Sequence, residues 1–182
     1  MAAKGREHSF HKIIGAKLNA SIPESFKVIR DQACGGDQQI PLFSESQKLR
    51  NTQLCKVDLL ITKNDQISVI IEIAETDLKP THVYGKFLTS ALASFYIQKT
   101  KKNKPIPMAE SVLFVQIVDM NSLSLKSRKF KQLYKIEQNI GKILPINGSR
   151  INKYRLSFID SAKPEKKIEE LVNCILEHLN MN

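Results

Sequence analysis

The sequence of 182 residues contains no tryptophan, and its three cysteines, Cys34, Cys55 and Cys174, form neither a CxxC pair nor a Cys/His zinc spacing. An odd number of cysteines without such spacing argues against a disulfide scaffold or a zinc ribbon. It is typical of reduced thiols in a cytoplasmic protein, which is the location we expect. The missing tryptophan, together with the lack of an RNP-type aromatic pair, gives little support for binding single strands by base stacking.

Long apolar runs are also lacking. No segment approaches the length needed to cross a bilayer, and the polar N-terminus MAAKGREHSFHK has no apolar signal-peptide core. No GxxxxGKS loop, GxGxxG fingerprint or nucleophile elbow appears, which argues against nucleotide-binding and acyl-transfer proteins. With 42% hydrophobic residues, the composition predicts one soluble domain over residues 1–182, with a full-sized core and no membrane partner.

Acidic residues are scarce in the second half of the chain. Residues 99–182 carry 16 Lys and Arg against 8 Asp and Glu, whereas residues 1–98 carry 12 against 10, so most of the net charge of +10 lies in the second half. A concentrated basic surface is expected where a polyanion binds, although a Lys-rich solvated surface has the same composition. The residues that we expect to contact nucleic acid are Lys99, Lys101, Lys102, Lys104, Lys126, Arg128, Lys129 and Lys131.

The stretch from Lys56 to Glu75 predicts a β-hairpin that carries two acidic residues in apolar surroundings. Two runs rich in Ile and Val flank the turn residues Lys63-Asn64-Asp65-Gln66. Asp58 lies in the first run and Glu72 in the second, and an antiparallel pair centred on this turn brings them nearly opposite each other. Two carboxylates that close repel unless a divalent cation holds them. The alternative is that both lie on a solvated face of the sheet.

Asp58, the hairpin and Glu72-Ile73-Ala74 resemble the PD-(D/E)XK nuclease superfamily, which includes many type II restriction endonucleases and the archaeal Holliday-junction resolvases. The resemblance covers roughly residues 5 to 120 and implies that Asp58 and Glu72 bind Mg²⁺, or Mn²⁺ in its place, with the Ile73 carbonyl as a further ligand. Two positions depart from the motif. Val57 replaces its Pro, and Ala74 stands where its Lys should be, although an alanine can neither bind a metal nor move a proton.

Three other residues are candidates for completing such a site. Glu7 lies on the inner face of a helix predicted from about residue 5 to 20, and the resemblance implies a third carboxylate there; complementing the helix dipole is the other explanation. Lys86 lies about two turns into a helix predicted from Thr81 to Gln98. It is a candidate for the missing motif Lys, with a solvated surface Lys as the alternative. Lys79 is a second candidate for the same role.

Hydrophobic periodicity predicts the element order αβββαβαβα, which is a mixed α/β fold with a central mixed β-sheet flanked by helices. This order fits a restriction-endonuclease-like core. The segment that ends at Arg50 has no clear period and is expected to be a loop. We expect His8 and His11 to be surface or DNA-facing residues. The predicted strands are residues 26–30, the two arms of the hairpin, 111–118 and 150–159, and the predicted helices are 5–20, 81–98, one in the 120s and 130s, and 164–179.

These features predict a Mg²⁺-dependent endonuclease that cuts double-stranded DNA at a specific sequence, like a type II restriction enzyme of a restriction-modification system, and that pairs as a homodimer. Ala74 predicts weak or absent cleavage. One alternative is a structure-selective repair nuclease or junction resolvase. Two others are a catalytically dead DNA-binding protein of the same fold, and a basic α/β protein that binds RNA or another protein.

Overall fold

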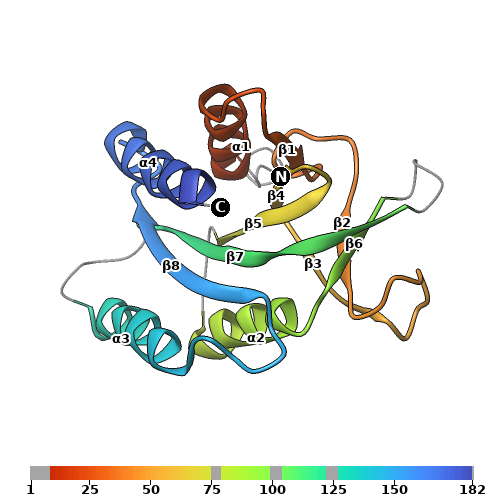
Figure 1. The fold of residues 1–182 in the computed structure, drawn as a ribbon. Coiled ribbons are helices and arrows are strands. Elements are labelled where there is room, and N and C mark those ends of the chain that lie inside the picture. Colours follow the sequence, from red (N-terminus) through yellow and green to blue (C-terminus); the bar gives the residue numbers. More distant parts are fainter. Residues whose placement is uncertain (1–8, 75–78, 99–103, 122–126, 182) are drawn as a thin grey trace, which may run out of the picture.

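The computed structural model describes residues 9–74, 79–98, 104–121 and 127–181. Over these residues the protein is mixed α/β, with a central mixed sheet of eight strands between two pairs of helices (Figure 1). None of the described helices is both long and apolar enough to span a bilayer. The elements are α1 (Ser9–Ser21), β1 (Lys27–Arg30), β2 (Ile40–Phe43), β3 (Gln53–Val57), β4 (Leu59–Lys63), β5 (Gln66–Ala74), α2 (Pro80–Ala91), β6 (Phe95–Ile97), β7 (Pro105–Asp119), α3 (Arg128–Ile143), β8 (Ile151–Ile159) and α4 (Glu165–Met181).

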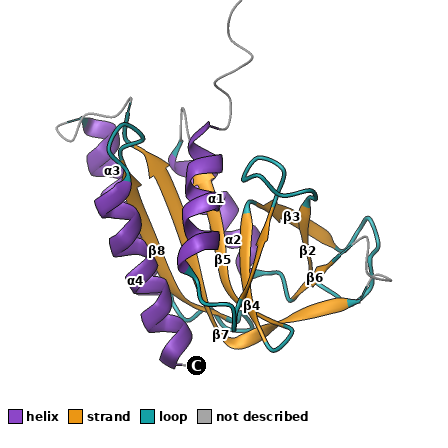
Figure 2. Ribbon diagram, turned by 90° about the horizontal axis from the view of Figure 1, so that it is seen from above, coloured by secondary structure: helices purple, strands orange, loops and turns teal. Residues whose placement is uncertain are grey.

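The strands are ordered β1-β4-β5-β7-β6-β2-β3. Outside this path, β8 pairs with residues 112–119 of β7. The first part of the sheet, β1-β4-β5, is antiparallel, whereas β5, β7 and β8 run parallel. The remaining strands β6, β2 and β3 form an antiparallel arm that joins the first half of β7 and extends to one side of the helices (Figure 2). The long strand β7 therefore belongs to both parts of the sheet.

The predicted hairpin is confirmed as β4 and β5. Asn64 and Asp65 occupy the turn with φ of 51° and 58°, the left-handed region that Asn and Asp tolerate better than other side chains. Leu59 pairs with Ile71, so the same register places positions 58 and 72 opposite each other, as expected. Nearer the turn, a bulge between Ile61 and Thr62 shifts the register by one residue.

Hydrophobic side chains form two cores, one on each face of the sheet. Alternate residues of β5 face opposite cores. Ile70 packs on the side of α2 and α3, whereas Ile71 packs on the side of α1 and α4. Figure 1 shows these two helix pairs on opposite faces. Residues 112–118 of β7 are all buried, which confirms the prediction of a central strand covered on both faces.

The predicted element order is wrong in two places. The segment expected to be a loop contains β2, and β3 lies between this segment and the predicted hairpin. The helix expected to reach Gln98 ends at Ala91 and is followed by β6. The backbone of Ser94 explains this end, because its N–H donates to the Phe43 carbonyl at 2.8 Å and its carbonyl accepts from the Met108 N–H at 2.9 Å. Pairing with β2 and β7 thus overrides an apolar spacing that is compatible with a helix.

Close backbone contact at Gly15 holds α1 against the loop of residues 31–39. A side chain added at Gly15 would overlap the Cys34 carbonyl oxygen and lie 2.9 Å from the Cys34 Cβ. We therefore expect Gly15→Ala to lower the free energy of unfolding by roughly 1–3 kcal/mol, because α1 must move away from the loop. Urea unfolding followed by circular dichroism would measure this.

Gly141→Ala is the matched control. Gly141 lies in α3 and has no neighbour within 4 Å of an added Cβ. This substitution should raise stability by about 0.5–1 kcal/mol through the helix propensity of alanine. Equal effects of the two substitutions would contradict the close contact at Gly15.

Candidate functional site

Asp58 lies where β3 passes into β4, between two strands that pair with different neighbours. Its Oδ2 accepts a hydrogen bond from the Ile73 N–H at 2.6 Å, and its backbone carbonyl accepts from the Asp31 N–H at 2.9 Å. The side chain is only 17% exposed. Burial raises the pKa of Asp58 against the opposing effect of the Ile73 hydrogen bond. The main chain therefore fixes the carboxylate at the break between the strands.

Glu72 is a deeply buried acid in β5, with 5% of its surface exposed. Both of its carboxylate oxygens accept hydrogen bonds from the Lys86 ammonium at 3.1 Å. Burial and the nearby Asp58 charge raise the pKa of Glu72 to about 8, while Lys86 opposes the rise. Two acids thus share one cation in a region of low polarity.

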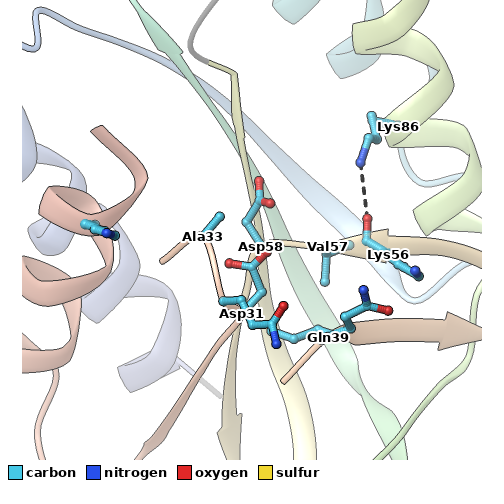
Figure 3. A pocket seen from close by; sticks show the side chains of 10 residues that line it. Asp31, Ala33, Gln39, Lys56, Val57, Asp58 and Lys86 are labelled. Atoms are coloured by element: carbon cyan, nitrogen blue, oxygen red, sulfur yellow. Dashed lines mark hydrogen bonds between the residues drawn. The ribbon is translucent and has the colours of Figure 1, made fainter. Parts of the chain in front are cut away.

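Lys86 belongs to the second turn of α2 and reaches the sheet from the helix. Besides Glu72, its ammonium donates to the Lys56 backbone carbonyl at 3.2 Å (Figure 3). Burial lowers the pKa of Lys86, but the Glu72 carboxylate outweighs burial and the net pKa is raised. Lys86 is therefore a cation at neutral pH, and its position beside Glu72 is not that of an ordinary solvated lysine.

Asp58 and Glu72 lie close enough for the Asp58 charge to act on Glu72, and two such carboxylates could hold a divalent cation. Burial raises the pKa of both Asp58 and Glu72, and the Asp58 charge raises the pKa of Glu72 further. N–H and C=O of one strand residue face the same side, so the Ile73 carbonyl faces Asp58 together with its N–H. Carboxylate and carbonyl oxygens are ligands that Mg²⁺ accepts alongside water and phosphate. Among the described residues, three or more His, Cys, Asp or Glu side chains do not gather as a metal site.

Ala74, the departure from the motif, ends β5 and is half-buried. It lines a pocket of about 200 Å³ together with Glu72, His82, Lys86 and Gln116. The structure therefore brings positions 74 and 86 to the same cavity. Glu7, the expected third carboxylate, lies outside the described residues.

The predicted nucleic-acid contacts are only partly described. Lys104 is exposed and pairs with Asp65 in the β4–β5 turn at 2.7 Å, at the opposite end of β5 from Glu72. Arg128, Lys129 and Lys131 lie in the first turn of α3. The described ranges leave out Lys99, Lys101, Lys102 and Lys126.

The surface placement expected for His11 is wrong. His11 is 8% exposed, and its Nε2 lies 3.8 Å from Asp58 Oδ2. Its place in the sequence gave a signal for burial, because His11 shares a helix face with Ile14 and Leu18. His8 lies outside the described residues.

Sequence reasoning missed a buried polar pair beside Glu72. Gln116 pairs with Glu72 across β5 and β7, and its Oε1 accepts from the Tyr154 hydroxyl at 2.6 Å. Its Nε2 donates to the Val83 carbonyl of α2 at 3.3 Å. Gln116 therefore ties the sheet to the helix that carries Lys86. A polar residue inside the apolar run Val112–Val118 was the available signal, since buried amides require partners.

Comparisons with protein families, with curated proteins and with solved structures found no match for this chain.

The raised pKa of Glu72 predicts how stability changes with pH in metal-free buffer. Because the folded-state pKa of about 8 exceeds the ordinary value of 4.5, the contribution of Glu72 to stability is complete below pH 4.5 and is lost as pH rises through 8. We expect Glu72→Gln to gain stability over the natural protein between pH 5 and pH 8.5, by on the order of a few kcal/mol. Urea unfolding in EDTA measures the difference. A difference that stays constant with pH would contradict the assignment.

Proposed function

We propose that the protein is a Mg²⁺-dependent nuclease that hydrolyses phosphodiester bonds of double-stranded DNA at a specific sequence, as type II restriction enzymes do. The observation that carries the proposal is the pair of buried acids, Asp58 and Glu72, with the Lys86 ammonium 3.1 Å from both Glu72 oxygens. Paired carboxylates with an adjacent lysine can supply the metal ligands and the cation for metal-assisted phosphodiester hydrolysis.

The arrangement around the pair supports the same proposal. The strands β1, β4, β5 and β7 lie side by side in the sheet. Along the chain, α1 precedes these strands and α2 comes between β5 and β7. If β2, β3 and β6 are set aside as an added arm, this is the order expected from the resemblance. Asp58 then lies directly before β4 and Glu72 lies in β5, which are the positions that the resemblance implies for the two motif acids.

Asp58, Glu72 and the Ile73 carbonyl would hold the metal ion, which would supply a water of lowered pKa and neutralise charge on the phosphate. The Ile73 N–H holds the Asp58 carboxylate in place, so Asp58 needs little rearrangement to bind. Lys86 would take the part of the motif Lys from α2. The Glu72 carboxylate raises the pKa of Lys86, so Lys86 would be a cation that could orient water and stabilise negative charge.

Substitution of Lys86 tests its part in the reaction. We expect Lys86→Gln to lower the rate of plasmid cleavage in Mg²⁺ by roughly 10²–10³, because a preorganised cation at the reacting phosphate is lost. Lys79→Gln, at the N-cap of the same helix, is the matched control and should stay near the natural rate. Equal loss in both variants, or full activity of Lys86→Gln, would show that Lys86 has no specific part in cleavage.

Substitution of Asp58 tests the metal site. Asp58→Asn should abolish cleavage, and retained cleavage would overturn the proposal.

The same assay separates sequence-specific from structure-selective cleavage. Linear, branched and flapped duplexes of equal length are compared, since a restriction enzyme cuts unbranched duplex at one short sequence. Preference for a junction or a flap would favour a repair nuclease or resolvase. Sedimentation with and without DNA checks the proposed two-fold dimer, for which palindromic sites are the physical reason.

A catalytically dead DNA-binding protein of the same fold is a second candidate, and Ala74 together with the Lys86–Glu72 contact favours it. Calorimetric titration with Mn²⁺ distinguishes the two. A nuclease should bind the ion in the natural form and lose binding in Asp58→Asn and Glu72→Gln, because both carboxylates are needed. A dead protein has no reason to retain the site, so absence of heat in the natural protein would favour it.

A further inference from the structure

A pocket of about 540 Å³ opens beside Asp58, and it is lined from α1, from the loop of residues 31–39, from β3 and from α2 (Figure 3). Its volume is in the range of sites that enclose most of a drug-sized ligand, so a nucleotide unit of comparable size can enter. Asp58 and Lys86 form part of its wall. Whatever occupies this pocket therefore lies against the proposed reaction centre.

Two further lysines line the pocket from different elements. Lys12 comes from α1 and Lys56 from β3, and both are exposed. The Lys86 ammonium is already engaged by Glu72, and Lys12 and Lys56 are two further exposed lysines in the lining. Glutamine side chains at positions 32 and 39 add amide donors to the same lining. Ammonium and amide groups are among the donors that contact phosphate oxygens in protein–DNA complexes.

The walls that carry these donors are fixed by the main chain. The Asp31 N–H donates to the Asp58 carbonyl, and the Asp31 carboxylate accepts from the Cys34 N–H at 2.8 Å. Gly15 lets α1 pack directly on this loop, which sets the position of Lys12 relative to Asp58. A preorganised pocket loses less conformational entropy when it binds a ligand.

We propose that this pocket holds the phosphodiester backbone of the DNA strand next to the cleaved phosphate, and that Lys12 and Lys56 are its cationic contacts. This inference rests on the proposed function and assigns its substrate-binding residues. It departs from the basic residues predicted from composition. Lys104 is at the far end of β5, and Arg128 and Lys131 belong to α3, which contributes no residue to this pocket.

The salt dependence of DNA binding tests the inference. A fluorescent 20-base-pair duplex (an arbitrary probe length of roughly two helical turns) is titrated in EDTA, without cleavage, over a range of KCl concentrations. Each phosphate contact contributes about 0.9 to the slope of log K against log salt. The variant Lys12→Gln/Lys56→Gln should therefore lose about 1.8 from the slope of the natural protein. Lys12→Arg/Lys56→Arg should restore it, since the charge is retained.

The control is Lys17→Gln/Lys166→Gln, which removes the same charge. Lys17 lies on α1 but lines a different pocket, between α1 and α4, and Lys166 is exposed on α4. Its slope should match the natural protein. Equal slopes for all variants, or equal losses in the test and control pairs, would overturn the pocket assignment while leaving the nuclease proposal standing. Failure of the natural protein to bind duplex DNA at any salt concentration would overturn both.

Discussion

A carboxylate removed from water needs a cation or a proton, and Glu72 meets this requirement in the interior of the sheet. The neighbouring strands are apolar on both faces, and Glu72 retains only 5% of its exposure. Lys86 from α2 supplies the charge, with both carboxylate oxygens within 3.1 Å of its ammonium. The position of α2 over the sheet is therefore coupled to the ionisation of one acid, and Gln116 strengthens the coupling through the Val83 carbonyl.

The buried carboxylate of Asp58 is stabilised by a backbone hydrogen bond. β3 and β4 are consecutive in the chain but pair with different strands, so the backbone changes partners at position 58. Beyond this point the Ile73 N–H lacks a facing β4 residue and donates to the Asp58 side chain instead. A strand end thus supplies the hydrogen bond that a buried carboxylate requires. The same break leaves room for the large pocket beside Asp58.

The acids could be predicted because their chemistry conflicts with their surroundings. Asp58 and Glu72 interrupt runs of Ile and Val, and the turn residues at 64 and 65 give the register that opposes them. Gln116 interrupts another apolar run in the same way and was recoverable by the same rule. Local patterns also predicted the helix that carries Lys86, although they contain no information about which groups its ammonium contacts.

The added arm and the pocket could not be predicted from local patterns. β2, β3 and β6 are short, and their stability comes from pairing with segments distant in the sequence. Pro41 and the polar residues before Arg50 are typical of loops, so they conceal the strands. The pocket joins residues from α1, the 31–39 loop and β3, and their spacing along the chain contains no information about their proximity. Basic composition consequently directs attention to the second half of the chain, whereas Lys12 and Lys56, the cations proposed to contact the DNA backbone, come from the first.

The cavity shared by Ala74 and Lys86 gives a physical reason for an alanine at the motif position. It has a volume of about 200 Å³, and Glu72 forms one wall. A lysine at position 74 would bring a second ammonium into the same small space, and two like charges there would repel in a region of low polarity. A small side chain at 74 leaves the cavity to the helix-borne cation. Alanine at 74 and lysine at 86 are in this sense one solution to the charge of Glu72, which agrees with a nuclease whose cation comes from α2 and also with a protein of the same fold that has lost its activity.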